Sequence, residues 1–161
     1  TSLGDTLDVL AIGFSKGTSG RITAGVVEFS TLEQLKSAAR LYKSKDYVSS
    51  ITLSGAAEEI LGKIAKERKG INQLDHDVAQ FKALYDYFSG QSLSNKEAIF
   101  KRNKIKNELK HNDSGKNEWV SGDFEHEAAM FFVKGVKNYF DCYNEYPQSK
   151  MIQRLFDHLT M

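Results

Sequence analysis

The residue types best suited to chemistry gather in one short stretch, residues 102–111, with the sequence RNKIKNELKH. A histidine moves protons near neutral pH, and a lysine or arginine holds a phosphate and offsets developing charge. An asparagine both donates and accepts hydrogen bonds. On a helix, this stretch has a polar stripe at four-residue spacing, formed by Asn103, Asn107 and His111. Such groups could support cleavage of a phosphodiester by its own 2′-hydroxyl, which needs no metal. A basic helix that ends in histidine is also common, so spacing alone leaves a plain solvated helix open.

The same stretch lies in a local excess of positive charge. The whole chain has 22 Lys and Arg against 21 Asp and Glu, which excludes a globally basic nucleic-acid-coating protein. Residues 96–116 hold seven basic and three acidic side chains, whereas the segment after them is acidic. Lysine and arginine attract a polyanion by charge alone. The predicted nucleic-acid-binding side chains are Lys101, Arg102, Lys104 and Lys110. A solvated helix face would explain the same charges.

Other enzyme templates fail. The sequence has no glycine-rich phosphate loop before a helix and no His-Glu-x-x-His, and no two of its four histidines have metal-ligand spacing. We therefore predict no metal and no cofactor. Two histidines stand between carboxylates, in Asp75-His76-Asp77 and in Glu125-His126-Glu127. Each lies in the first turn of an expected helix, where acidic side chains are favoured by the helix dipole, so we interpret both as structural.

Composition predicts one globular, cytoplasmic domain. The length of 161 residues fits a single core. A single proline argues against a β-sandwich or barrel with many tight turns. The single cysteine, Cys142, excludes a disulfide framework within the chain and fits a reducing compartment. No apolar run approaches the ~20 residues of a membrane span, and the first residues lack the pattern of a signal peptide. We therefore predict no membrane association.

Hydrophobic periodicity predicts an all-α, up-and-down bundle of five to six helices over residues 30–161. Ser30-Thr31-Leu32-Glu33 matches a capping box that would start the first helix. The predicted helices span about residues 30–42, 46–70, 75–88, 94–110 and 123–143, with a last one near 152–159. Gly55 and Gly62 lie opposite the apolar stripe of the second helix, which predicts that this helix is central and closely approached on both sides.

Two further expectations concern the start of the chain and the aromatic residues. Residues 1–29 are predicted to form an N-terminal arm or a small hairpin, because the segment 21–29 is rich in β-branched residues and follows a turn-like segment. Aromatic residues at helical spacing, such as Phe81 and Phe88, are interpreted as core and not as a surface for stacking bases.

Several segments of the chain resemble the HEPN superfamily, which consists of small all-α domains. They are residues 32–42 (LEQLKSAARLY), 46–61 (DYVSSITLSGAAEEIL), 106–113 (KNELKHND) and the helix over 123–140. The resemblance covers roughly residues 30–143, and it is strongest to short, stand-alone bacterial HEPN-like proteins. Many HEPN proteins are metal-independent endoribonucleases of toxin–antitoxin, abortive-infection or phage-defence systems. The resemblance therefore implies an RNA ligand, a homodimer, and an antitoxin or nucleotidyltransferase-type protein partner.

The HEPN signature is an arginine, commonly followed by a polar residue, with four to six residues between the arginine and a histidine. Two chains pair so that both signatures line one composite cleft. The resemblance places His111 at the histidine position, Asn107 at the polar position and Lys106 at the arginine position. Lysine keeps the charge but lacks the planar fork that matches a phosphate. Arg102 is a weaker alternative, since on an unbroken helix it lies about 13 Å and half a turn from His111.

Two functions are consistent with this resemblance. The first is an RNA-binding protein that cleaves RNA at a composite site containing Lys106, Asn107 and His111. The second is a non-catalytic HEPN-like module that binds a protein partner or a nucleotide, its signature degenerated to Lys-x4-His. The sequence leaves enzyme status open between them.

Overall fold

The computed structural model of the chain describes residues 19–111 and 119–161. Within these ranges it contains seven α-helices and no strand, which confirms the all-α prediction. The helices are α2 (Ser19–Lys43), α3 (Tyr47–Lys69), α4 (Gln73–Ser89), α5 (Asn95–Arg102), α6 (Lys104–His111), α7 (Phe124–Tyr143) and α8 (Lys150–Thr160).

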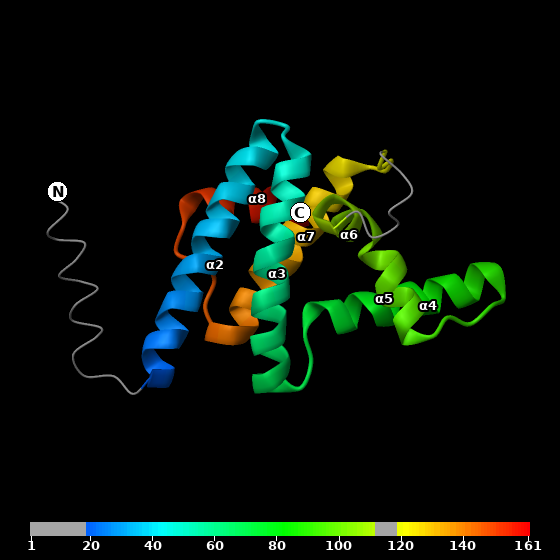
Figure 1. Cartoon of the computed structure of the whole chain (residues 1–161), viewed down its shortest axis with the longest axis horizontal. Helices are drawn as coiled ribbons and strands as arrows, with labels where there is room; N and C mark the ends of the chain where they lie inside the picture. The colour runs from blue at the N-terminus through cyan, green and yellow to red at the C-terminus, as the bar shows by residue number, and fades with distance from the viewer. Residues whose placement is uncertain (1–18, 112–118) are drawn as a thin grey trace, which may run out of the picture.

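The centre of the fold is α3, which packs against α7 on one side and α2 on the other (Figure 1). The main core between these helices and α8 is built from buried side chains such as Leu35, Leu61, Phe132 and Ile152. The prediction that this helix is central is confirmed. None of the helices in the described ranges is long and apolar enough to cross a membrane.

Side chains from other helices approach α3 closely at Gly55 and Gly62, the two positions at which close approach was predicted. A Cβ atom added at Gly55 would lie 2.7 Å from Cδ of Lys106 on α6. One added at Gly62 would lie 3.2 Å from the side-chain nitrogen of Asn138 on α7. Side chains of other helices therefore approach α3 closely at both glycines, and the contact is tightest at Gly55, as the sequence suggested.

Most predicted helix ends are confirmed by their caps. Asp46 accepts a hydrogen bond from Ser49 N–H at the start of α3, and Gly70 ends that helix with φ +77°. Ser94 and Glu97 form the expected reciprocal capping box at the start of α5. One exception is α4, which begins two residues earlier than predicted. An Asn72–Asp75 capping box starts it there.

The predicted start of the first helix at Ser30 is wrong, since α2 already runs from Ser19 to Lys43. Segment 21–29 is helical and not a strand of a hairpin, and the rest of the predicted arm, residues 1–18, lies outside the described residues. The hydroxyl of Thr31 donates to the carbonyl oxygen of Val27 at 2.9 Å, a bond within the helix. Glu28 accepts a hydrogen bond from the hydroxyl of Tyr139 on α7 at 2.9 Å, while Val26 and Phe29 are exposed. Thr31 and Leu35 are fully buried, so the packed part of α2 follows this segment.

The predicted helix over residues 94–110 is divided into α5 and α6. Asn103 ends α5 with φ −103° and ψ 6°, and its N–H donates to the carbonyl oxygen of Ile99. The helix pair α4 and α5 projects from the bundle, and we call residues 73–102 the α4–α5 arm (Figure 1). In contrast, α6 packs on α3. Arg102 and His111 therefore lie on two separate helices. The separation of about 13 Å expected on one unbroken helix does not apply to them.

Candidate functional site

Lys106, the residue predicted to replace the HEPN arginine, is buried. It is 5% exposed, and its Nζ lies 3.6 Å from Oε2 of Glu58 on α3 and 5.2 Å from the ring centre of Phe131 on α7. Burial lowers the pKa of the Lys106 ammonium, while the carboxylates of Glu58 and Glu59 oppose that shift. Within this single chain the ammonium is therefore held inside the fold, and the predicted cleft between two chains stays a prediction.

A pocket of about 250 Å³ opens beside this ion pair, between α3 and α6. Both Lys106 and Asn107 line it, so the structure brings two of the three predicted catalytic residues to one place. Asn103 also lines it, and the buried Oδ1 of this side chain has no hydrogen-bond partner among the described residues. His111 is the last residue of α6, and its side chain lies outside the part of the structure that is described.

The Lys106–Glu58 ion pair belongs to a larger buried charge network around Phe131. The ring of Phe131 has Nζ of Lys106 at 5.2 Å and Nζ of Lys134 at 4.4 Å from its centre, which are cation–π contacts. Lys134 pairs with Oδ2 of Asp77 at 3.3 Å, so the network joins α7 to α4. The sequence carries one sign of it: Lys134 stands three residues after Phe131 and therefore neighbours it on the helix surface.

Two of the four predicted nucleic-acid-binding cations are engaged in ion pairs. Arg102 donates from Nε and Nη2 to the two carboxylate oxygens of Asp77, at 2.9 and 3.2 Å, and contacts the sulfur of Met130. Lys110 lies 3.4 Å from Glu59. Burial opposes ionisation of Glu59, but the ammonium groups of Lys106 and Lys110 lower its pKa. The predicted four-residue binding patch is therefore reduced to Lys101 and Lys104, which are exposed.

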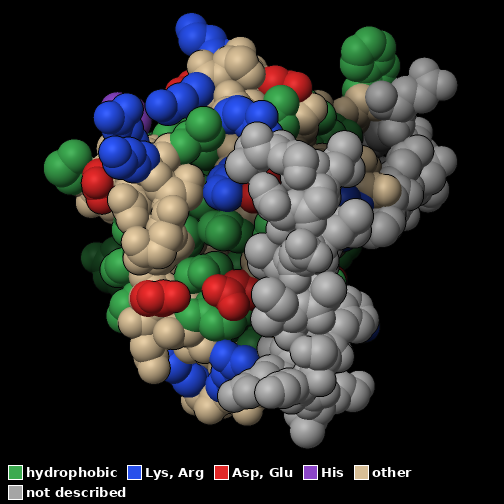
Figure 2. All heavy atoms as spheres, turned by 90° about the vertical axis from the view of Figure 1, so that its left-hand side faces the viewer, with side chains coloured by type: hydrophobic (Ala, Val, Ile, Leu, Met, Phe, Trp, Pro, Cys, Tyr) green, Lys and Arg blue, Asp and Glu red, His purple; other side chains and the backbone are tan. Residues whose placement is uncertain are grey.

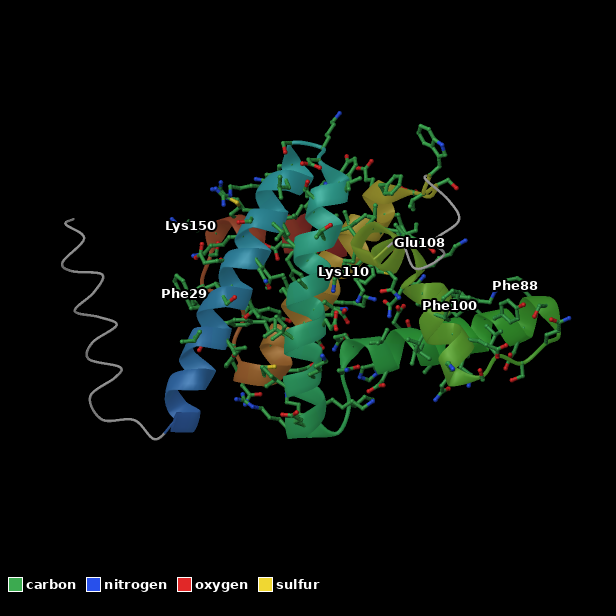
Figure 3. All side chains as sticks on the ribbon, in the orientation of Figure 1. Phe29, Phe88, Phe100, Glu108, Lys110 and Lys150 are labelled. Carbon is green, nitrogen blue, oxygen red and sulfur yellow. The ribbon has the colours of Figure 1, made fainter. Side chains whose placement is uncertain are left out.

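Near these lysines, the free end of the α4–α5 arm exposes large aromatic side chains. Tyr87 is 82% exposed, Phe88 80% and Phe100 58%. Figure 3 shows Phe88 and Phe100 on the arm, away from the bundle. The interpretation of the aromatic residues as core is wrong here. Helical spacing shows which residues share a face, but whether another element covers that face depends on tertiary packing.

The opposite side of the molecule has a different surface. Figure 2 shows the side on which α2 lies, where acidic and basic side chains are interspersed with hydrophobic ones in the part not drawn in grey. Phe29 of α2 is 67% exposed. Exposed aromatic side chains therefore occur on α2 as well, but the α4–α5 arm carries more of them, namely Tyr87, Phe88 and Phe100.

A second cleft, which was not predicted from the sequence, lies between α4 and α7 and has a volume of about 390 Å³. His76 and His126, the two histidines interpreted as separate structural features, both line it, together with Lys134 and Lys137. The repeated pattern of a histidine between carboxylates was the available signal. Among the described residues, no three His, Cys, Asp or Glu side chains are grouped closely enough to hold a metal ion.

No protein-family model, curated protein or solved structure matches the chain.

Proposed function

We propose that the protein binds single-stranded RNA through the α4–α5 arm. The observation that carries this proposal is the exposure of Tyr87 and Phe88 at the free end of the arm and of Phe100 on α5. Lys96 and Lys101 also lie on α5, and Lys104 follows it. Unpaired bases stack on exposed aromatic side chains, and lysines beside them attract the phosphate backbone. The resemblance to HEPN proteins supports the same ligand.

The arm has the physical properties that such a surface requires. Its aromatic side chains occupy a projecting pair of helices, so a strand can reach them without entering the bundle (Figure 1). Base stacking on an aromatic side chain contributes about 1–3 kcal/mol per base and tolerates any base sequence. Lys101 already lies 5.9 Å from the ring centre of Tyr85, so a cation and an aromatic ring are neighbours on this surface.

In this proposal Lys106 contributes to the fold and does not act on a phosphate. Its ammonium is buried and paired with Glu58, and moving it to a bound RNA would leave that carboxylate buried without a partner. The function that we propose is therefore binding without cleavage at the residues Lys106, Asn107 and His111.

The test measures the binding of a fluorescently labelled single-stranded RNA to the wild-type protein and to Tyr87→Ala and Phe88→Ala. Phe29→Ala is the matched control, because Phe29 is equally an exposed aromatic residue but lies on α2. We expect each arm variant to weaken binding by about fivefold or more and Phe29→Ala to leave it unchanged. Affinity should fall as salt concentration rises.

Two results would refute the proposal. One is the absence of RNA binding by the wild-type protein, and the other is an equal loss of affinity in Phe29→Ala and the two arm variants. The first result would direct the search to a protein partner for the same apolar surface, to which Leu84 and Ile99 also contribute.

A further inference from the structure

The cleft between α4 and α7 combines side chains that suit an anion. His76, Gln73 and Gln80 come from α4, and His126 and Lys137 come from α7. Lys137 and both histidines are exposed, so their polar groups reach solvent at the walls of the cleft. Imidazole, amide and ammonium groups all donate hydrogen bonds, and phosphate oxygens accept them.

The charge balance of the cleft also favours an anion. Asp77 is the one carboxylate among the described residues that line it, and both of its oxygens are occupied. Arg102 binds Oδ1 and Oδ2, and Lys134 lies 3.3 Å from Oδ2. Two cations therefore compensate one carboxylate, and Lys137 adds a further positive charge at the surface.

Two carboxylates close to the cleft lie near cations. Asp141 accepts a hydrogen bond from Gln73 at 2.9 Å and pairs with Lys69. Burial raises the pKa of Glu127, although Arg102 and Lys134 oppose that shift.

The α4 wall of the cleft continues into the aromatic surface of the arm. At 100° per residue, Gln73, His76, Gln80, Leu84 and Tyr87 lie within about 80° of one another on the helix. This face is about 21 Å long from Gln73 to Tyr87, at 1.5 Å per residue. Its first half forms the cleft with α7, and its second half carries exposed Leu84 and Tyr87. An RNA strand bound along this face would meet the hydrogen-bond donors of the cleft first and the ring of Tyr87 next.

We propose that the α4–α7 cleft is a binding site for backbone phosphates of the RNA whose bases stack on the arm. His76, His126 and Lys137 donate hydrogen bonds to phosphate oxygens, and Lys134 holds Asp77 away from the ligand. This inference rests on the proposed RNA binding and extends the binding surface from α4 and α5 to α7.

The first experiment compares the RNA affinity of Lys137→Ala with that of Lys150→Ala over a series of salt concentrations. Both lysines are exposed, but Lys150 begins α8 and does not line the cleft. In a plot of log affinity against log salt concentration, losing one phosphate contact should make the negative slope about 0.7 less steep. We expect Lys137→Ala to show that change and to bind about three- to tenfold more weakly. Lys150→Ala should behave as the wild type. Equal slopes for the two variants would overturn the inference.

The second experiment separates this inference from the proposed function. Sodium tripolyphosphate is added to the isotopically labelled protein, and the imidazole signals of His76 and His126 are followed by NMR, with backbone amides of α2 as the reference. Tripolyphosphate has the charge of an RNA backbone but no base to stack, so it should shift both imidazole signals selectively. No selective shift would overturn the cleft as an anion site even if RNA binds the arm. A selective shift without RNA binding would refute the proposed function and the passage of RNA through the cleft, leaving a site for free polyphosphate.

Discussion

Gly55 of α3 lies directly against the side chain of Lys106 of α6. A Cβ atom at Gly55 would come within 2.7 Å of Lys106 Cδ, closer than two such carbon atoms approach. The missing side chain lets Lys106 lie across α3 and reach Glu58 and Phe131. The position of the buried ammonium therefore depends on a glycine fifty-one residues earlier in the chain.

This relationship predicts the effect of Gly55→Ala. The added methyl group must displace the Lys106 side chain, and such overpacking costs about 1–3 kcal/mol. The variant should therefore be less stable than the wild type in urea unfolding. Gly25→Ala is the matched control, because a Cβ at Gly25 in α2 has no atom within 4 Å and alanine favours a helix by up to about 1 kcal/mol. The close contact would be contradicted if Gly55→Ala were as stable as Gly25→Ala.

The lowered pKa of Lys106 predicts how stability depends on pH. Because burial lowers this pKa in the folded state, the unfolded chain binds more protons between the lowered value and about 10.4, the value for a free lysine. The contribution of Lys106 to the free energy of unfolding therefore rises with pH in that window. We expect Lys106→Met to remove this rise.

The measurement is urea unfolding at several alkaline pH values, with Lys106→Met compared to the wild type at each. The comparison is needed because burial raises the pKa of the Cys142 thiol to about 11, and this shift makes stability fall over the same range. Cys142 is common to both proteins, so it cancels in the difference. An equal pH dependence in both proteins would show that Lys106 keeps its ordinary titration in the fold.

Asp77 is predicted to hold the α4–α5 arm to α7. Asp77→Asn keeps the size of the side chain but leaves Arg102 and the buried Lys134 without their shared carboxylate. We expect a loss of stability of about 2–3 kcal/mol, since breaking a buried ion pair leaves an uncompensated charge. Amide hydrogen exchange should accelerate in α4 and α5 more than in α2 and α3. Asp86→Asn, on the exposed side of α4, is the control and should change neither quantity.

Cys142 is predicted to be unreactive in the folded protein. Its thiol is 7% exposed and donates to the carbonyl oxygen of Leu61 at 3.3 Å, and burial raises its pKa to about 11. Because the thiolate is the reactive form, a thiol reagent at pH 8 should modify it only after unfolding in urea. Rapid modification without denaturant would show that the C-terminal end of α7 opens readily.

Cleavage of RNA tests the remaining role of the HEPN-like residues. We expect a mixed RNA pool in EDTA to remain intact with the wild-type protein, with His111→Ala and with Lys106→Arg. The arginine substitution restores the guanidinium of the HEPN signature, but in this fold it would be buried at Gly55. Cleavage by the wild type that disappears in His111→Ala would contradict a purely binding function and would place a catalytic site at the end of α6.

The helices and their ends were largely predictable because their causes are local. Asp46 and Ser94 cap helices through side chains three residues from their partners, and Gly70 and Gly90 supply the left-handed conformation that ends a helix. The start of α2 was not predictable in this way. Its residues 21–29 favour strands locally, but they continue the helix whose later residues, such as Leu35, pack in the core.

By itself, the sequence determined the all-α class, the central helix with its two close approaches, and which residues could carry charge or stack bases. Only the tertiary structure decided which of them are free to do so. It buried Lys106 on Glu58 and paired Arg102 with Asp77, while it left Tyr87 and Phe88 uncovered. It also placed His76 and His126, fifty residues apart, on one cleft. Burial and ion pairing depend on which helices meet in space, and helical periodicity records only which residues share a face.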